Sequence, residues 1–330
     1  MRRMVPPAAG DGVAARGDPG AARARHVAFA VMSDLASTPG VRVDATRHGR
    51  VVTLDGTFGR ATVHEHGAHV TSWVPAGDEE ALFVSRLARI DGRSAIRGGV
   101  PVIFPQFGPG PITKHGFART ARWTLAAHGT DGGENGAPWA RLDLADDEAT
   151  RATWPHEFQA QLTVRAERAL AMSLAITNTG DTPFSFTGAL HTYLRVADVT
   201  RARVQGLDGV RVRDQLAGGA ERVEMEAGGV RIAGPVDRVY VDARAPLAVV
   251  DEVAGRTLRL TARGFPDVVL WNPWVEGARA FDDMDDEEWR TMLCLEAAVV
   301  ATPVTLAPGA RWEGVQRWSS ERLAAERPTS

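Results

Sequence analysis

Short segments in which apolar and polar residues alternate begin at Val51 and recur along most of the chain. A period of two is typical of β-strands that bury one face. Turn-forming residues such as Asp55-Gly56 and Asn178-Thr179-Gly180-Asp181 separate the segments. The predicted strands are Val51–Leu54, Ala61–His64, Leu125–Ala127, Ala140–Leu144, Gln159–Arg165, Leu170–Thr177, Phe184–Val196, Val239–Asp242, Leu247–Asp251, Thr257–Thr261, Val268–Trp271, Met292–Val300 and Trp312–Trp318.

Helical patterns do not alternate with these strands, so the sequence predicts an all-β fold, a large antiparallel sandwich. The first 45 residues differ from the rest, because they are rich in Ala, Arg, Gly and Pro and show no sustained period. We expect residues 1–45 to be a poorly structured tail with at most one short helix, around His26–Leu35. Residues 46–320 are then the β-sandwich domain, and 321–330 a C-terminal tail.

Composition narrows the class of protein. Hydrophobic residues make up 44% of the 330 residues, enough for one large core. The formal net charge is -3, from 41 acidic and 38 basic residues, so the sequence lacks the excess of positive charge that is typical of nucleic-acid-binding proteins. The single cysteine, Cys294, favours a reducing cytosol, and no apolar run approaches the ~18 residues of a membrane span. We therefore expect a cytoplasmic monomer that binds neither nucleic acid nor membrane.

Two glycine-containing segments carry cations. Arg97-Gly98-Gly99 places a guanidinium beside a flexible backbone, and Lys114-His115-Gly116-Phe117-Ala118-Arg119 holds two cations and a histidine. Arginine binds phosphate oxygens in bidentate fashion and lysine adds a point charge, so the two segments could form a phosphate pocket. Taken singly, each is interpreted more simply as a solvated loop with surface cations.

His191 lies in the predicted strand Phe184–Val196. Alternation puts His191, Tyr193 and Arg195 on one face, and the apolar residues Leu190, Leu194 and Val196 on the other. The first face suits a polar concave surface, but it equally suits a solvated strand face.

Glu296 is the one charge in the apolar run Met292–Val300. A carboxylate in a buried strand is costly unless it is paired or functional, and desolvation would raise its pKa toward the range of a general base. The alternatives are an outward-pointing glutamate or a structural ion pair.

Three further groups contain residue types that occur in binding sites. His64-Glu65-His66 with His69 offers metal-ligand types, but the spacing provides no complete zinc ligand set, so we expect no metal. The acidic run between Asp282 and Glu288 is interpreted as a solvated loop. Trp271-Asn272-Pro273-Trp274 holds two aromatic rings that could stack on a sugar, and one of them is expected to pack inside.

Taken together and in order, six segments resemble the hexose-6-phosphate mutarotases, the glucose-6-phosphate 1-epimerase branch of the aldose-1-epimerase (galactose mutarotase-like) superfamily. The resemblance spans about Val51 to Trp318, and it implies a large β-supersandwich fold and no cofactor. The segments are Arg97-Gly98-Gly99, His115-Gly116-Phe117-Ala118-Arg119, His191-Thr192-Tyr193, Asp237-Arg238-Val239-Tyr240, Trp271-Asn272-Pro273-Trp274 and Cys294-Leu295-Glu296.

The resemblance also implies roles. His191 and Glu296 match the catalytic residues of the family. The matches to substrate-binding residues are Arg97, Arg119, Asp237 and His115, whereas Lys114 stands where some relatives carry a neutral polar residue. Two departures concern neighbours of these residues: Ala297 follows Glu296 where the family usually has proline, and Pro235-Val236 precedes Asp237 where relatives favour Glu-Thr.

The implied reaction interconverts the α and β anomers of hexose 6-phosphates, with glucose 6-phosphate as the leading substrate. In the expected mechanism Glu296 is the base at O1 and protonated His191 the acid at O5, on opposite sides of the sugar. Two alternatives remain at this point: an aldose 1-epimerase acting on unphosphorylated sugars, and a sugar-phosphate-binding protein without catalytic activity.

Overall fold

A computed structural model describes residues 38–131, 136–243 and 246–323. These residues form three antiparallel sheets with few helices, which confirms the predicted all-β class. The predicted helix at His26–Leu35 and most of both predicted tails lie outside the described residues. Among the described residues, no helix is both long enough and apolar enough to span a lipid bilayer.

The first sheet has four strands in the order β1-β2-β3-β4. Their bounds are β1 Val41–Thr46, β2 Gly49–Gly56, β3 Gly59–His64 and β4 His69–Pro75. Strand β1 therefore begins inside the stretch assigned to the N-terminal tail, because its residues pair with β2 from Val41↔Leu54 to Thr46↔Gly49.

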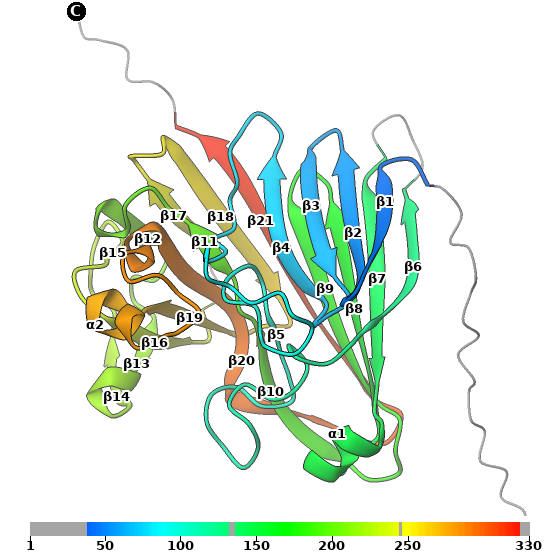
Figure 1. Ribbon diagram of the computed structural model, residues 1–330. Coiled ribbons are helices and arrows are strands. Elements are labelled where there is room, and N and C mark those ends of the chain that lie inside the picture. The colour runs from blue at the N-terminus through cyan, green and yellow to red at the C-terminus, as the bar shows by residue number, and fades with distance from the viewer. Residues whose placement is uncertain (1–37, 132–135, 244–245, 324–330) are drawn as a thin grey trace, which may run out of the picture. The chain divides into compact units, whose positions relative to one another are not determined.

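The second sheet has nine strands in the order β15-β12-β17-β18-β21-β9-β8-β7-β6. Their bounds are β6 Thr124–Thr130, β7 Pro138–Ala145, β8 Phe158–Ala166, β9 Leu170–Asn178, β12 Ala202–Gln205, β15 Val230–Arg231, β17 Leu247–Asp251, β18 Arg256–Arg263 and β21 Arg311–Arg322. Burial alternates strictly along β8, as expected for a strand with one face in the core. The four-stranded sheet lies over β7 and β8 (Figure 1).

The third sheet has eight strands, ordered β14-β13-β16-β19-β20-β10-β5 with β11 also paired to β20. Their bounds are β5 Val102–Ile103, β10 Phe184–Leu190, β11 Tyr193–Arg195, β13 Arg211–Asp214, β14 Ala220–Val223, β16 Val236–Val241, β19 Asp267–Asn272 and β20 Met292–Leu306. The central β20 is buried on both faces from Met292 to Val299, which explains its continuous apolar run.

Short helices complete the described structure. They are the α-helices α1 Glu148–Thr153 and α2 Trp274–Arg279 and the 3-10 helices Val199–Arg201, Gln215–Ala217 and Glu288–Thr291.

The prediction of one unbroken strand over Phe184–Val196 was wrong. Strand β10 ends at Leu190 and β11 begins at Tyr193. The reason is local, because the Thr192 amide donates back to the Leu190 carbonyl at 2.9 Å and the chain bends there. The bend puts His191 at the end of a strand, next to β20, instead of within a regular ladder.

Candidate active site

A cavity of about 590 Å³ lies over the eight-stranded sheet. Its volume is in the range of small-molecule sites, roughly 300–1,000 Å³. All seven residues singled out in the sequence line it: Arg97, Lys114, His115, Arg119, His191, Asp237 and Glu296. Residues scattered over 200 positions of the chain are therefore brought to one place.

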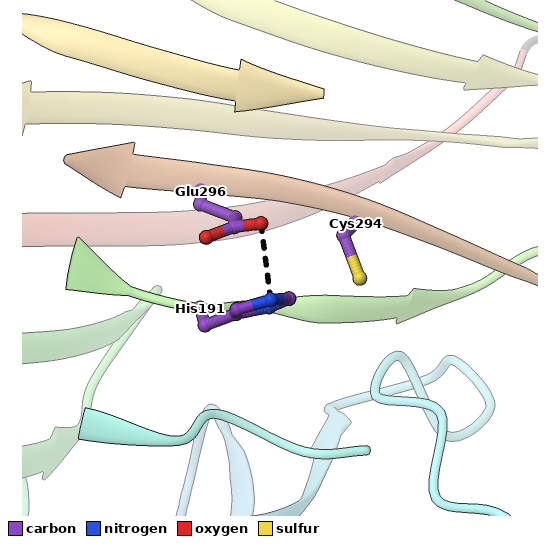
Figure 2. A group of neighbouring side chains, drawn as sticks. All are labelled: His191, Cys294 and Glu296. Carbon is purple, nitrogen blue, oxygen red and sulfur yellow. Dashed lines mark ion pairs between the residues drawn. The ribbon is translucent and has the colours of Figure 1, made fainter. Parts of the chain in front are cut away.

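His191 and Glu296 form a buried pair (Figure 2). Nε2 of His191 lies 3.3 Å from Oε1 of Glu296, and the residues are 8% and 1% exposed. The sheet register produces the contact, since Leu190 of β10 pairs with Ala297 of β20. The two groups touch each other and do not face one another across a substrate, unlike the arrangement expected from the sequence. An adjacent pair still suits both oxygens, because O1 and O5 of a pyranose are attached to the same carbon.

The electrostatics of the pair favour its neutral form. Burial, and after it the Asp237 carboxylate, raises the pKa of Glu296 well above its usual range. Burial, and after it the His115, Arg119 and Arg97 side chains, lowers the pKa of His191 well below 6.5. Both directions favour the form in which Glu296 is protonated and His191 is neutral when substrate is absent.

Each member of the pair also has a second polar side-chain atom, which is not part of the contact between them. Oε2 of Glu296 and Nδ1 of His191 are buried and have no hydrogen-bond partner within the part of the chain that the structure describes. Buried polar atoms are normally satisfied, so unsatisfied ones in a cavity point to a ligand or to water.

Aromatic rings hold the imidazole of His191 in place. The Tyr193 ring stacks on it at 4.8 Å and 12°, and the His115 ring approaches edge-on at 5.7 Å. The Trp271 ring lies 6.3 Å away and also lines the cavity. A half-buried tryptophan in such a wall offers a flat face for the C–H groups of a sugar. Trp274 packs against Trp289 at 4.3 Å instead, and both Trp271 and Trp274 are half-buried.

Arg97 is fixed from three sides. Its Nε donates to Oδ1 of Asp283 at 3.0 Å, its Nη1 donates to the Tyr193 hydroxyl at 3.3 Å, and its guanidinium lies 4.2 Å from the centre of the Phe281 ring. The interpretation of the acidic run as a solvated loop is thus wrong for Asp283, which anchors a cavity residue. Nothing in the sequence links the two residues, since 186 positions separate them.

Glycines shape the segment that carries Arg97. Gly99 has φ +62, and a Cβ there would lie 2.2 Å from the Val70 carbonyl oxygen. The Gly98 carbonyl accepts a hydrogen bond of 2.7 Å from Nε2 of His69. Only glycine permits this approach to β4, so Arg97 is held at a defined distance from the sheet.

The loop that carries Lys114, His115 and Arg119 is anchored to the core through Phe104. The amides of Phe117 and Ala118 both donate to the Phe104 carbonyl at 3.2 Å. Gly116 has φ +67, and a Cβ there would lie 2.2 Å from the same carbonyl oxygen. The glycine of the His-Gly segment is therefore required by the close packing of this loop.

The same loop fixes the tautomer of His115. The Gly108 amide donates to Nδ1 of His115 at 3.3 Å, so the ring proton lies on Nε2. Burial, followed by the nearby Arg119, Lys114 and Arg97, lowers the pKa of His115 to about 3. His115 is therefore a neutral hydrogen-bond donor in the cavity. Arg119 is oriented by a 2.9 Å hydrogen bond from Nη2 to the Lys114 carbonyl.

Asp237 enters the cavity from β16, where it pairs with Trp271 of β19. Burial raises its pKa, and Lys114 opposes that shift.

Ala297, which replaces the proline expected after Glu296, pairs with Leu190 on one side and Val268 on the other. The alanine leaves β20 regular beside the His191–Glu296 pair.

The histidines that suggested a metal site have other partners. Nε2 of His64, His66 and His69 contacts the Thr71 hydroxyl, the Ser94 carbonyl and the Gly98 carbonyl, respectively. A second set is created by the fold: donor atoms of His191, Cys294 and Glu296 all lie within 4.8 Å of one another. We interpret this set as a hydrogen-bonded pair with a buried thiol beside it, because burial raises the pKa of the Cys294 thiol and so disfavours the thiolate that a metal would require.

Comparison with known proteins fits this geometry. The model of the aldose 1-epimerase family matches residues 50–319. The chain belongs to the aldose 1-epimerase family. A family member from Cenchrus ciliaris, named "Putative glucose-6-phosphate 1-epimerase", is 38% identical over 261 residues, covering 77% of this chain and 79% of the relative. A relative from Salmonella typhimurium with the same name is 33% identical over 256 residues, covering 77% and 84%.

Solved structures share the fold of this chain. The crystal structure of a protein from Salmonella typhimurium described as a "putative mutarotase" has a TM-score of 0.79 and 28% identity, covering 88% of this chain and 96% of that one. A galactose mutarotase-like protein from Clostridium acetobutylicum has a TM-score of 0.68 over 86% of this chain and 98% of its own. Its 14% identity supports the fold only.

The sequence missed several cavity residues. Phe107, Gln215, Phe281 and Val300 line the cavity, and Asp283 anchors Arg97. Val300 lies within β20 and the others lie outside strands, in segments without a distinctive pattern, so only the folded chain reveals them.

Proposed function

We propose that this protein interconverts the α and β anomers of hexose 6-phosphates, glucose 6-phosphate first, by acid/base-catalysed opening and closure of the sugar ring. One observation carries the proposal: a buried acid/base pair shares its cavity with three cations, Arg97, Lys114 and Arg119. The names of the similar proteins support the choice of substrate.

The mechanism follows from the contact between His191 and Glu296. With Glu296 as carboxylate and His191 protonated, Glu296 takes the proton of the C1 hydroxyl and His191 donates its proton to O5. The C1–O5 bond breaks and an aldehyde forms at C1. After rotation about C1–C2, protonated Glu296 returns a proton to O1 and neutral His191 takes one from O5. The pair ends as it began, so no proton is exchanged with solvent.

Other cavity residues hold the sugar. Asp237 accepts hydrogen bonds from ring hydroxyls, and His115 donates one from Nε2. Arg97 and Arg119 bind the phosphate, with Lys114 as a more exposed third cation. Trp271 covers one face of the ring.

Exchange NMR at the anomeric signals of glucose 6-phosphate, galactose 6-phosphate and free glucose tests the proposal. Exchange of the 6-phosphates should accelerate in proportion to enzyme concentration, and more than that of glucose. Acceleration of glucose alone would favour an aldose 1-epimerase of unphosphorylated sugars, in line with the family name. Binding of the 6-phosphates with no acceleration at all would leave only a sugar-phosphate-binding protein.

We also propose that the enzyme is a cytoplasmic monomer that needs no cofactor or metal. The single, buried Cys294 supports a reducing compartment, and the residues of the mechanism come from one chain. Dialysis against a chelator should leave the exchange rate unchanged, and light scattering should give the mass of one chain. Loss of activity restored by a divalent metal would contradict the metal-free mechanism.

A further inference from the structure

His191 faces an excess of positive charge. The neutral His115 ring lies against it at 5.7 Å, and the Arg97 guanidinium reaches it through the stacked Tyr193 ring. Arg119 and Lys114 line the same cavity. The groups that oppose these cations are Glu296 and the buried Cys294 on β20, Asp237 on β16, and Asp283 in the loop beside Arg97.

The cavity cations differ in whether a carboxylate neutralises their charge. Arg97 is paired with Asp283 at 3.0 Å. No salt bridge joins Arg119 to a carboxylate in the part of the chain that the structure describes, and its guanidinium donates to a neutral carbonyl. Arg119 is also half-buried, so its charge is poorly screened by water. The cavity therefore carries an uncompensated positive charge on the side of His191.

This charge opposes the proposed chemistry as long as the cavity is empty. An imidazolium is disfavoured by burial and by neighbouring cations, and the shared proton then rests on Glu296. In this neutral pair Glu296 at O1 is an acid and His191 at O5 is a base, which is the reverse of the assignment that ring opening requires. A substrate phosphate carries a charge of about -1.5 to -2 near pH 7, enough to reverse the balance.

We propose, on the basis of the function proposed above, that the substrate phosphate acts in the chemical step as well as in binding: held by Arg119 and Arg97, it cancels the positive charge that faces His191 and so switches the pair into its active form. The switch moves one proton and no electrons. The proton on Glu296 crosses the 3.3 Å contact to Nε2 of His191 and leaves Glu296 as the carboxylate base. No proton is supplied by the phosphate or by solvent.

The phosphate then has an effect that does not depend on its attachment to the sugar. Xylose lacks the C6 group of glucose, so it leaves the phosphate position free for phosphite dianion. Phosphite should raise the enzymatic kcat/KM for xylose mutarotation in a saturable manner, by about tenfold or more, since one pKa unit changes the protonated fraction about tenfold. The rate at the same phosphite concentration without enzyme is subtracted.

Two negative results would contradict different claims, one the activating role of the phosphate and the other the proposed function itself. If phosphite leaves xylose turnover unchanged while glucose 6-phosphate exchange is catalysed, the proposed function stands and the activating role of the phosphate is overturned. If glucose 6-phosphate exchange is itself not catalysed, the proposed function has failed first.

The variant Arg119→Gln distinguishes a role of Arg119 in activating the His191–Glu296 pair from a role only in binding the phosphate. Loss of the uncompensated cation should raise the phosphite-free turnover of xylose above that of the wild type, by several-fold, and should remove most of the phosphite activation. An arginine that only holds phosphate would leave the phosphite-free rate unchanged, and that outcome overturns the electrostatic account. Arg259→Gln is the matched control, because Arg259 is exposed on β18 and pairs with Glu321; it should behave as the wild type.

Discussion

The two ends of the cavity are built in different ways. The acid/base end comes from the sheet: Glu296 lies within β20, and His191 follows the last residue of β10. The cation end comes from loops before and after β5, which carry Arg97, Lys114 and Arg119. The first end is buried and packed among rings, whereas Lys114 of the second is exposed.

Under the proposed function, this difference in construction corresponds to two tasks. Proton transfer needs desolvated groups at a fixed distance, and strands in the middle of a sheet provide both. Recognition of a substituent at the far end of the sugar tolerates adjustment, so loops anchored to the core by a few hydrogen bonds suffice. Substitutions at the sheet end should therefore affect phosphorylated and free sugars alike, whereas the effect of substitutions at the loop end should depend on the phosphate.

The largest effect is expected at the sheet end. Glu296→Gln keeps the shape of the side chain but removes the base, so kcat should fall by about 10²–10⁴-fold on phosphorylated and free sugars alike. Adding His191→Ala should cost little more, because the two groups act as a unit. Exchange NMR measures the rates, and calorimetry should still detect glucose 6-phosphate binding. Full activity of either single variant would contradict the assignment.

The pH dependence of kcat/KM for free glucose tests the pair without a phosphate. The active pair holds one proton. Burial lowers the pKa of His191, so the second, inactivating proton should be taken up only below pH 6.5. The rate should therefore persist as the pH falls through 6.5 and then drop up to about tenfold per pH unit. An acid limb centred at or above pH 6.5 would show that the histidine is not desolvated as described.

At the loop end, Arg97→Ala should act mainly on phosphorylated substrates. Loss of a hydrogen bond to a charged group costs about 1.5–3 kcal/mol, which corresponds to roughly a ten- to hundredfold lower kcat/KM for glucose 6-phosphate. Free glucose should be affected far less. Steady-state kinetics on both sugars provide the measurement, and an equal loss on both would remove Arg97 from the phosphate site.

A smaller effect is expected from the anchor of Arg97. Asp283→Asn removes the charge but keeps a hydrogen-bond acceptor, and the Phe281 ring still supports the guanidinium. The KM for glucose 6-phosphate should change by less than about tenfold with kcat nearly unchanged. Asp282→Asn is the matched control, because Asp282 pairs with Arg89 at the surface and such pairs contribute little. Identical kinetics of the two variants would exclude a role of Asp283 in the site.

Much of the fold could be predicted from local pattern. The segment Gln159–Arg165 alternates because its strand has one face in the core, and the run Met292–Val300 is apolar because β20 is covered on both faces. The bend at His191-Thr192 escaped prediction, since alternation continues across it and only a hydrogen bond between neighbouring residues marks it.

The site was predictable as a set of residue types, but its geometry was not. Glycines in the Arg97 and His115 segments indicated backbones under close contact, and the structure shows the carbonyls that they approach. The direct contact of His191 with Glu296 and the pairing of Arg97 with Asp283 depend on strand order and loop placement. Such long-range pairings leave no local periodicity in the sequence.

The ratio of the catalysed anomer exchange rate of glucose 6-phosphate to that of free glucose tests the division of tasks most directly. It should be measured under one set of conditions for the wild type, Glu296→Gln and Arg97→Ala. We predict that Glu296→Gln lowers both rates by a similar factor and leaves the ratio nearly unchanged, while Arg97→Ala lowers the ratio by about tenfold or more. A ratio that collapses in Glu296→Gln, or that stays constant in Arg97→Ala, would contradict the account.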